Sequence, residues 1–399
     1  MTLMSGTPQT MARVNRSAIR RAIEEWGPIP RVELARRLSL SGATVTRVVA
    51  GLLAEGTVIE ERQGASTGGR RPILLRLAPR VSTVIAVDVG GTKIATGTID
   101  RSGGILYERV AATQQPGTTP LDVLLREIAA AREEADRHGI VIGGIGIGAP
   151  GIAHQQSGMV EYAPAVGWEG YPLRCAVAEV TGLPVFIEND GNLAALGEYT
   201  YGAGQGEPCL VVIVVGTAVG SGIVIGGRLH RGAQEAAGEI GYYLPSRGAL
   251  AMTYPGFGAL EGEVAGAGIV RRARERIVAG EQSSLRPIAD ALTARAVFDA
   301  AEAGDALAES VVSETADVLA LVIGAYATIL NPSKVIIGGG VGRRASALIP
   351  RIREQLTGRV PFVPALAGSA LHERAVLYGA AAFASRSLIG GVSVTETQP

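Results

Sequence analysis

Residues 84–99 read VIAVDVGGTKIATGTI, and residues 210–225 read LVVIVVGTAVGSGIVI. Each stretch consists of an apolar strand, a glycine-rich turn and a second apolar strand. Because the same unit occurs twice, about 126 residues apart, the sequence predicts a duplicated fold in which two similar lobes face one cleft. Strand and helix patterns alternate along residues 81–399, which is typical of an α/β architecture.

The two turns contain candidate phosphate-binding residues. Glycine lets backbone N–H groups approach anionic oxygens, because it has no side chain and adopts positive φ angles at little cost. An acid in the first turn can hold a metal-bound water beside the phosphates, and threonine and lysine offer hydrogen-bond donors. The candidates are Asp88, Gly90, Gly91, Thr92, Lys93, Gly216 and Thr217. An ordinary hairpin can have the same composition, so each turn alone is a weak signal.

A third cluster follows an apolar strand. Residues 186–192 read FIENDGN and precede an expected helix over residues 193–199. The acid in this cluster, Asp190, has two interpretations. It can cap the helix, as acids often do at helix N-termini. It can instead act as the general base for a substrate hydroxyl in phosphoryl transfer, with Asn189 orienting the same substrate.

The N-terminal segment has the order helix, helix, helix, strand, basic turn, strand, which is the layout of a winged helix-turn-helix. The expected elements cover residues 15–26, 31–38, 41–56, 57–61 and 73–77. In the second helix, Val32 and Leu34 are expected to face the core. Ser41 is expected to cap the third helix.

The third helix and the basic turn are candidates for DNA binding. A helix in the major groove needs short polar side chains and arginine on the face opposite its core stripe. Arginines at the tip of the hairpin would reach a phosphate or the neighbouring minor groove. The candidate DNA-binding residues are Ser41, Thr44, Thr46, Arg47, Arg70 and Arg71. The alternative is a small helical module that binds another protein.

Charge is unevenly distributed along the chain. The formal net charge is zero, but residues 1–80 contain 13 Arg, no Lys and six Glu and so carry +7. The remaining residues therefore carry −7. One end of the chain can bind a polyanion such as double-stranded DNA, and the other would repel it. A further group of arginines, at positions 271, 272, 274 and 276, is expected to form a solvated helix face.

Cysteine content and hydropathy exclude several protein classes. Only Cys175 and Cys209 are present, which argues against a disulfide framework and a cysteine-rich zinc site. The N-terminus lacks the apolar core of a signal peptide, and the longest uncharged stretch, residues 208–227, is interrupted by glycines and predicts a hairpin rather than a membrane span. We therefore expect a cytoplasmic protein that has no membrane partner.

Together and in this order, the motifs resemble those of the ROK family, named for repressors, open reading frames and kinases. The resembling stretches are residues 87–93 (first phosphate loop), 146–151 (interlobe turn), 188–192 (catalytic segment), 216–223 (second phosphate loop), 238–241 (sugar-binding stretch) and 336–340 (adenosine-side turn). The resemblance covers nearly all of the chain. It implies an actin-like, ribonuclease H-like two-lobed fold preceded by a winged helix-turn-helix.

The resemblance also implies a domain division. The DNA-binding domain is expected at residues 1–80, the first lobe at 81–188 together with 375–391, and the second lobe at 189–374. The final helix, residues 378–387, is expected to return to the first lobe. Kinases of the family phosphorylate sugars with Mg-ATP, and its longer members, which carry a winged helix, are usually repressors that respond to a sugar.

The family's sugar-binding residues correspond to Asn189, Asp190, Glu239, Tyr242 and Glu261. Tyr242 stands where the family has a histidine that touches both sugar and zinc, and a phenol is a much poorer zinc ligand at neutral pH. The family's cysteine cluster is missing from residues 252–261. We therefore expect no structural zinc and no other metal site.

Further departures bear on ATP. Ala165 and His154 stand where the family commonly has Asn and Asp, and Ala218 replaces a glycine in the second phosphate loop. The added methyl group of Ala218 lies where backbone and phosphate must approach closely, which weighs against ATP binding.

The resemblance and its departures favour a sugar-responsive transcriptional regulator, most often a repressor of carbohydrate-metabolism genes. Such a protein would bind operator DNA and a sugar or sugar-phosphate effector as a homodimer or a dimer of dimers, and it would require no cofactor. The alternative is an ATP-dependent, glucokinase-like sugar kinase that uses Mg-ATP and Asp190 as its general base. Residual kinase activity is compatible with the first interpretation as well.

Overall fold

The computed structural model describes residues 8–62, 73–78, 83–254 and 258–390. The N-terminal elements are α1 (Pro8–Trp26), β1 (Ile29–Pro30), α2 (Arg31–Leu38), α3 (Gly42–Ala54), β2 (Val58–Arg62) and β3 (Ile73–Leu77). The three strands form an antiparallel sheet in the order β1-β3-β2. The expected helices and strands of this segment are therefore confirmed, and α1 begins seven residues earlier than expected, at Pro8.

Apolar spacing explains how these three helices pack. Ile19, Leu34 and Val49 come from the three helices and are fully buried in one cluster. Val32 is an exception, because it is 80% exposed although its position in the helical pattern predicted an inward side chain. The hydroxyl of Ser41 accepts a hydrogen bond from the backbone N–H of Thr44 at 3.1 Å, so the predicted cap of α3 is confirmed.

The first lobe contains a five-stranded sheet in the order β11-β7-β4-β5-β6. Its strands are β4 (Thr83–Val89), β5 (Lys93–Asp100), β6 (Ile105–Ala112), β7 (Ile145–Ala149) and β11 (Val185–Asn189). Two helices cover one face, α4 (Pro120–Arg137) and α5 (Leu173–Thr181), and a smaller sheet packs beside them, formed by β8 (Ile152–His154), β9 (Met159–Ala163) and β10 (Trp168–Tyr171). Alternate residues of β4 face opposite sides, with Ile85 and Val87 toward α4 and Val84 and Ala86 toward α13 (Ala375–Gly390).

The second lobe repeats this arrangement. Its sheet has the order β14-β13-β12-β15-β16, formed by β12 (Cys209–Val215), β13 (Val219–Ile225), β14 (Arg228–Leu229), β15 (Lys334–Gly338) and β16 (Ala365–Gly368). In both sheets three consecutive antiparallel strands are followed by two parallel ones. The duplication predicted from the two glycine-rich hairpins is therefore confirmed.

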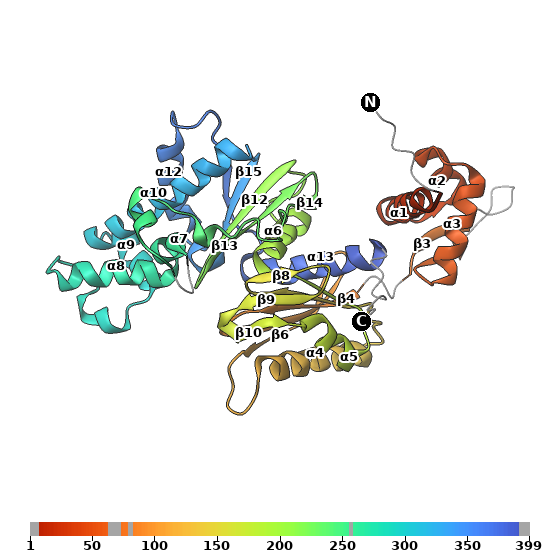
Figure 1. Cartoon of the computed structure of the whole chain (residues 1–399), viewed down its shortest axis with the longest axis horizontal. Coiled ribbons are helices and arrows are strands. Elements are labelled where there is room, and N and C mark those ends of the chain that lie inside the picture. Colours follow the sequence, from red (N-terminus) through yellow and green to blue (C-terminus); the bar gives the residue numbers. More distant parts are fainter. Residues whose placement is uncertain (1–7, 63–72, 79–82, 255–257, 391–399) are drawn as a thin grey trace.

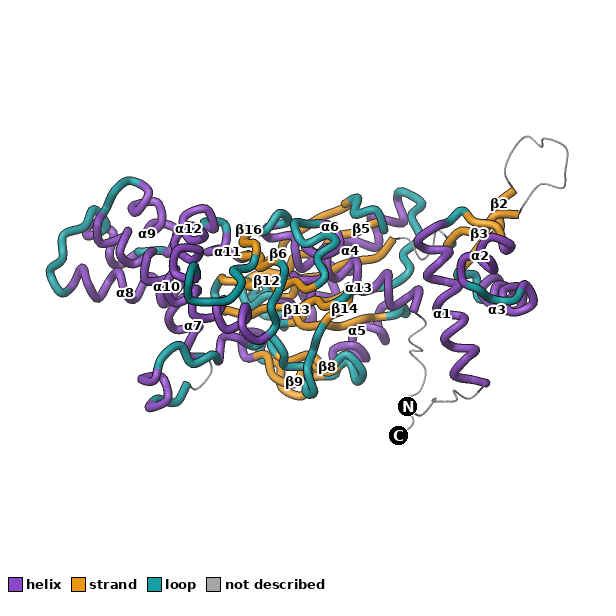
Figure 2. Tube along the Cα trace, turned by 90° about the horizontal axis from the view of Figure 1, so that it is seen from above, coloured by secondary structure: helices purple, strands orange, loops and turns teal. Residues whose placement is uncertain are grey.

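Helices cover the second sheet on one face. They are α7 (Ala259–Val264), α8 (Gly266–Val278), α9 (Ala294–Glu302), α10 (Ala306–Ile329) and α12 (Ala345–Leu356), and a short α11 (Gly339–Gly342) follows β15. The N-terminal helices lie at one end of the long axis of the molecule, and α8 and α9 lie at the other (Figures 1 and 2). No helix in the described part of the chain is long and apolar enough to cross a membrane.

Two helices connect the lobes. α6 (Asp190–Tyr201) packs on α13 and on strands β12 and β13, and α13 also contacts α1. Glycines allow the close approach of α6 and α13: a Cβ atom at Gly379 would lie 1.8 Å from the carbonyl oxygen of Leu193, and one at Gly197 would lie 2.2 Å from that of Ala375.

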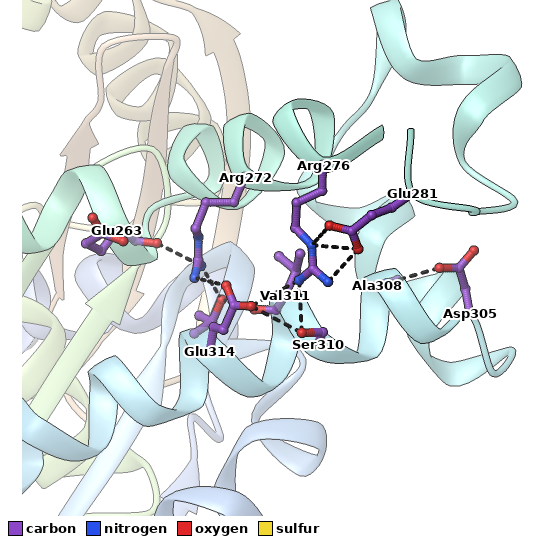
Figure 3. A network of polar contacts seen from close by, with 10 residues as sticks. Glu263, Arg272, Arg276, Glu281, Asp305, Ala308, Ser310, Val311 and Glu314 are labelled. Atoms are coloured by element: carbon purple, nitrogen blue, oxygen red, sulfur yellow. Dashed lines mark hydrogen bonds and ion pairs between the residues drawn. The ribbon is translucent and has the colours of Figure 1, made fainter. Parts of the chain in front are cut away.

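The expectation of a solvated arginine face on α8 is wrong in part. Arg271 is half exposed and pairs with Glu275, but the side chain of Arg272 is only 12% exposed and its guanidinium lies 3.3 Å from Glu314 of α10. Arg276 also pairs with Glu314, at 3.0 Å (Figure 3). The reason lies in the tertiary structure: α8 packs against α10, so Arg272 and Arg276 meet an acid of that helix, Glu314.

Candidate functional site

The candidate catalytic segment lies where β11 ends and α6 begins. Asn189 is the N-cap, because its side-chain oxygen accepts a hydrogen bond from the backbone N–H of Asn192 at 3.0 Å. The capping role that the sequence left open for Asp190 therefore belongs to Asn189. The Asn189 amide also donates to the carbonyl oxygen of Gly151 at 2.8 Å and lies 3.5 Å from a Glu239 carboxylate oxygen. Asp190 accepts a hydrogen bond from the N–H of Gly191 at 2.7 Å.

An ion pair with a buried acid lies next to this segment. Glu188 is 1% exposed and pairs with Arg231 at 2.6 Å. Its other carboxylate oxygen accepts a hydrogen bond from the Asn192 side chain at 3.0 Å. Burial raises the pKa of Glu188, and Arg231 opposes this shift. The sequence analysis did not identify Arg231, since a partner 43 residues away leaves no local pattern.

Two buried acids, Asp88 and Asp190, lie close enough for the charge of Asp190 to act on Asp88. Burial raises the pKa of Asp88 to about 7, the negative charge of Asp190 adds to the shift, and Lys93 opposes it. Burial raises the pKa of Asp190 to about 6, and the hydrogen bond from Gly191 opposes that shift. A carboxylate with a pKa near the working pH is suited to accept a proton from a hydroxyl group.

Glu239, Tyr242 and Glu261 lie near Asp190 and near one another. The pKa of Glu239 is raised to about 7 by burial first, and then by the charges of Asp190 and Glu261. The pKa of Tyr242 is raised by burial and by Glu239, Glu261 and Tyr162. The five sugar-binding candidates identified in the sequence therefore come together, from the start of α6, the loop after β14 and helix α7.

The two phosphate turns have different surroundings. In the first turn, a Cβ atom at Gly91 would lie 2.8 Å from the Cβ of Ala165, so Ala165 covers this turn closely. In the second, the carbonyl oxygen of Gly216 accepts a hydrogen bond from the N–H of Gly266 at 2.9 Å. A cavity of about 890 Å³ opens beside the second turn. Its lining comes from residues 216–344 and includes Gly216, Thr217, Phe298 and Gly340 together with three arginines, Arg295, Arg343 and Arg344.

Residues of the first turn are not among the described residues that line this cavity. The sequence analysis identified Gly216, Thr217 and residues 336–340 here but missed the arginines. Arg343 and Arg344 lie three and four residues after Gly340, the end of that last stretch, and this closeness in sequence is the local signal for them.

Comparison with known proteins shows to which family this chain belongs. Residues 84–387 match the model of the ROK family. The chain belongs to the ROK family. It is 36% identical over 281 residues to a glucokinase of Halalkalibacterium halodurans, which covers 68% of this chain and 84% of that protein. It is 30% identical over 355 residues to a putative xylose repressor of a Caldicellulosiruptor species, covering 87% of this chain and 88% of the repressor.

A solved structure of a ROK family transcriptional regulator, described as a homologue of the E. coli MLC protein, superposes with a TM-score of 0.83 at 25% identity. It covers 95% of this chain, and this chain covers 97% of it. The match with regulators therefore includes the N-terminal segment, whereas the match with the glucokinase leaves about a third of this chain uncovered. The actin-like two-lobed fold expected from the sequence is confirmed.

The zinc site implied by the ROK resemblance does not fit the residues present. Tyr242 offers a half-exposed phenol, and Met252 occupies part of the segment where the family has cysteines. Among the described residues, no group of three His, Cys, Asp or Glu side chains is arranged to hold a metal ion. The absence of zinc stays a prediction, and residues 255–257 of this segment lie outside the described part.

The structure describes four of the six candidate DNA-binding residues, which lie on or just before α3. Val45, Val49 and Leu52 are buried, and Thr46 and Arg47 on the other side are exposed. The Ser41 hydroxyl lies 2.9 Å from that of Thr44, so these two candidates also contact each other. Arg70 and Arg71 lie outside the described residues.

Proposed function

We propose that this ROK protein is a sugar-responsive, DNA-binding transcriptional regulator that represses carbohydrate-metabolism genes in the cytoplasm. The observation that carries the proposal is the joining of two parts in one chain. An arginine-rich N-terminal domain with an exposed polar face on α3 precedes a ROK body whose cleft gathers sugar-binding carboxylates. The similarity to regulators along nearly the whole chain supports it.

The effector is a sugar or a sugar phosphate that enters the cleft. Asp190, Glu239 and Glu261 accept hydrogen bonds from its hydroxyl groups, Asn189 fixes its orientation, and Tyr242 forms one wall. Carboxylates are strong acceptors for vicinal hydroxyls because each has two oxygens. The side-chain amide of Asn189 is already held by the carbonyl oxygen of Gly151, so it is preorganised to contact a ligand.

DNA is bound by the domain at residues 1–80 through Ser41, Thr44, Thr46 and Arg47, together with Arg70 and Arg71. The lobes are residues 81–188 with 375–391, and 189–374. A homodimer, or a dimer of dimers, presents two α3 helices to two half-sites of an operator. Sugar changes DNA affinity only if it binds one closure state of the lobes better than the other.

The first experiment measures binding of the purified chain to its own upstream intergenic DNA by fluorescence anisotropy. It uses two salt concentrations and a panel of glucose, xylose, N-acetylglucosamine and their phosphates. Arg47→Gln is expected to weaken binding about tenfold. Arg353→Gln, on the exposed side of α12, removes the same charge far from α3 and is expected to have little effect. If no specific DNA binding occurs in any condition, the proposal fails.

A second candidate function is an ATP-dependent sugar kinase. The raised pKa of Asp190, about 6, favours it, because such a group can take the proton of a sugar hydroxyl while the hydroxyl oxygen attacks the γ-phosphate and ADP leaves. Mg-ATP would supply the phosphoryl group, with Asp88 and the two turns on its phosphates. A coupled assay of ADP release with the same sugars tests this candidate. Turnover that is lost in Asp190→Asn would establish kinase activity.

A further inference from the structure

A chain of hydrogen bonds joins α10 to the segment that carries Glu239. The Tyr326 hydroxyl lies 2.6 Å from that of Ser221, and Ser221 donates to the carbonyl oxygen of Gly238 at 3.0 Å. A serine hydroxyl has one proton. Because Ser221 gives this proton to Gly238, Tyr326 must donate to Ser221. Burial raises the pKa of Tyr326, which keeps this phenol protonated as a donor.

The carbonyl group of Gly238 is held from several sides. It also accepts hydrogen bonds from the backbone N–H groups of Ser221 at 2.8 Å and Ile240 at 2.7 Å. Gly238 has φ +98°, and a Cβ atom there would lie 2.2 Å from the carbonyl oxygen of Ser221. The backbone just before Glu239 is therefore pressed against β13, and its position depends on the Ser221 contact.

A second set of contacts joins α10 to the helix that carries Glu261. The Arg272 guanidinium donates to the carbonyl oxygen of Glu263, in the last turn of α7, at 3.0 Å. The same nitrogen donates to the Thr315 hydroxyl of α10 at 2.7 Å, and the other terminal nitrogen lies 3.3 Å from Glu314 (Figure 3). Arg272 therefore ties the end of α7 to α10.

Thr315 and Tyr326 lie on one side of α10, because eleven residues correspond to about three helical turns. We propose that α10 positions the sugar-binding carboxylates: Tyr326 holds Glu239 through Ser221 and Gly238, and Arg272, anchored on Thr315, holds the helix that carries Glu261. Tyr326 does not itself touch the sugar and acts as a positioning residue. This inference rests on the proposed function, in which Glu239 and Glu261 bind the sugar.

The first test is a double-mutant cycle on the full chain with D-glucose, D-xylose and N-acetyl-D-glucosamine as probes in calorimetric titrations. Tyr326→Phe keeps the ring and removes one donor, so we expect the Kd to rise about 3- to 10-fold. In a Glu239→Gln background the same change is expected to alter the Kd less than about twofold, because Tyr326 acts through Glu239. An equal rise in the Kd in the wild-type and Glu239→Gln backgrounds would overturn the inference.

Tyr201→Phe is the matched control, because the Tyr201 hydroxyl donates to the carbonyl oxygen of Arg101 in the first lobe at 3.2 Å. It removes a partly buried tyrosine hydrogen bond without contacting the Glu239 segment. We expect less than about a twofold change in the Kd. A rise in the Kd as large as that of Tyr326→Phe would mean that the loss of any partly buried tyrosine hydrogen bond weakens sugar binding equally, and would also overturn the inference.

A second test needs no sugar. The carboxyl carbon of Glu239 is followed by NMR in full chain labelled with 13C at glutamate side chains, and its signal is assigned by its loss in Glu239→Gln. Asp190, Glu261 and Tyr242 are the titratable groups around it. Tyr326→Phe is expected to lower the titration midpoint, because a released side chain gains water. An unchanged midpoint would refute the positioning role. A lowered midpoint without binding of any sugar would leave that role standing and refute the sugar-binding function.

Discussion

Replacing Glu239 by Gln is expected to stabilise the protein near pH 8 while it weakens sugar binding. The pKa of Glu239 rises from 4.5 to about 7 on folding, through burial and the charges of Asp190 and Glu261. Between these pH values the folded protein keeps a proton that the unfolded chain has released. The free energy of unfolding therefore decreases as the pH rises through this window. Above pH 7 the folded protein bears the full free-energy cost of burying the ionised Glu239 carboxylate. Gln has the shape of the protonated acid and removes this cost.

The magnitude follows from the shift. A difference of about 2.5 pH units corresponds to ~3 kcal/mol, and movement of the loop toward water lowers the expected gain to about 1–2 kcal/mol near pH 8. Near pH 5 most of the cost is absent, so we expect less than half of this gain. Urea unfolding of both proteins at the two pH values, followed by circular dichroism, gives the free energies of unfolding. Glu179→Gln, exposed on α5, is the control for loss of one charge. A gain of equal size at both pH values, or no gain near pH 8, would refute the reasoning.

Three further predictions concern the lobes and the metal. Gly379→Ala is expected to lower the Tm by several degrees in thermal unfolding, because its Cβ would lie 1.8 Å from the carbonyl oxygen of Leu193 on α6; an unchanged Tm would contradict this packing. Arg231→Gln leaves Glu188 buried without its cation and is expected to lower the free energy of unfolding, measured with urea, by about 3 kcal/mol. A decrease below about 1 kcal/mol would contradict a structural role for this pair. Metal analysis of the purified chain is expected to find far less than one zinc per chain, because Tyr242 replaces the family's histidine and the family's cysteine cluster is missing; one zinc per chain would refute this expectation.

Local patterns predicted the duplicated part of the fold well. The alternation in residues 84–99 and 210–225 depends only on neighbours along each strand, and both hairpins formed with the expected strands. The site residues Asn189 and Asp190 were candidates because they follow an apolar strand, and Glu239 was identified through the family motifs. These residues lie close together only in the tertiary structure, where β11, α6 and the loop after β14 meet.

The sequence failed where partners come from distant elements. Arg272 looked solvated because its partners, Glu314 and Thr315, lie more than 40 residues away on α10. Val32 fits the inward stripe of α2 but is 80% exposed, because α2 is short and its core contact is made through Leu34. Periodicity gives the face of a helix but not how far the neighbouring elements extend over it.

The packing of α6 and α13 gives a physical route from the cleft to the N-terminal domain. Asp190 is the first residue of α6, and no side chain separates α6 from α13 where Gly197 and Gly379 meet the other helix's backbone. Close-packed backbones cannot absorb a shift by rearranging side chains, so a shift of α6 must either move α13 or break the contact. Because α13 also contacts α1, movement of α13 changes the packing of the N-terminal helices. Under the proposed function, a sugar that binds Asp190 more tightly in one position of α6 would therefore bias the N-terminal domain without touching it.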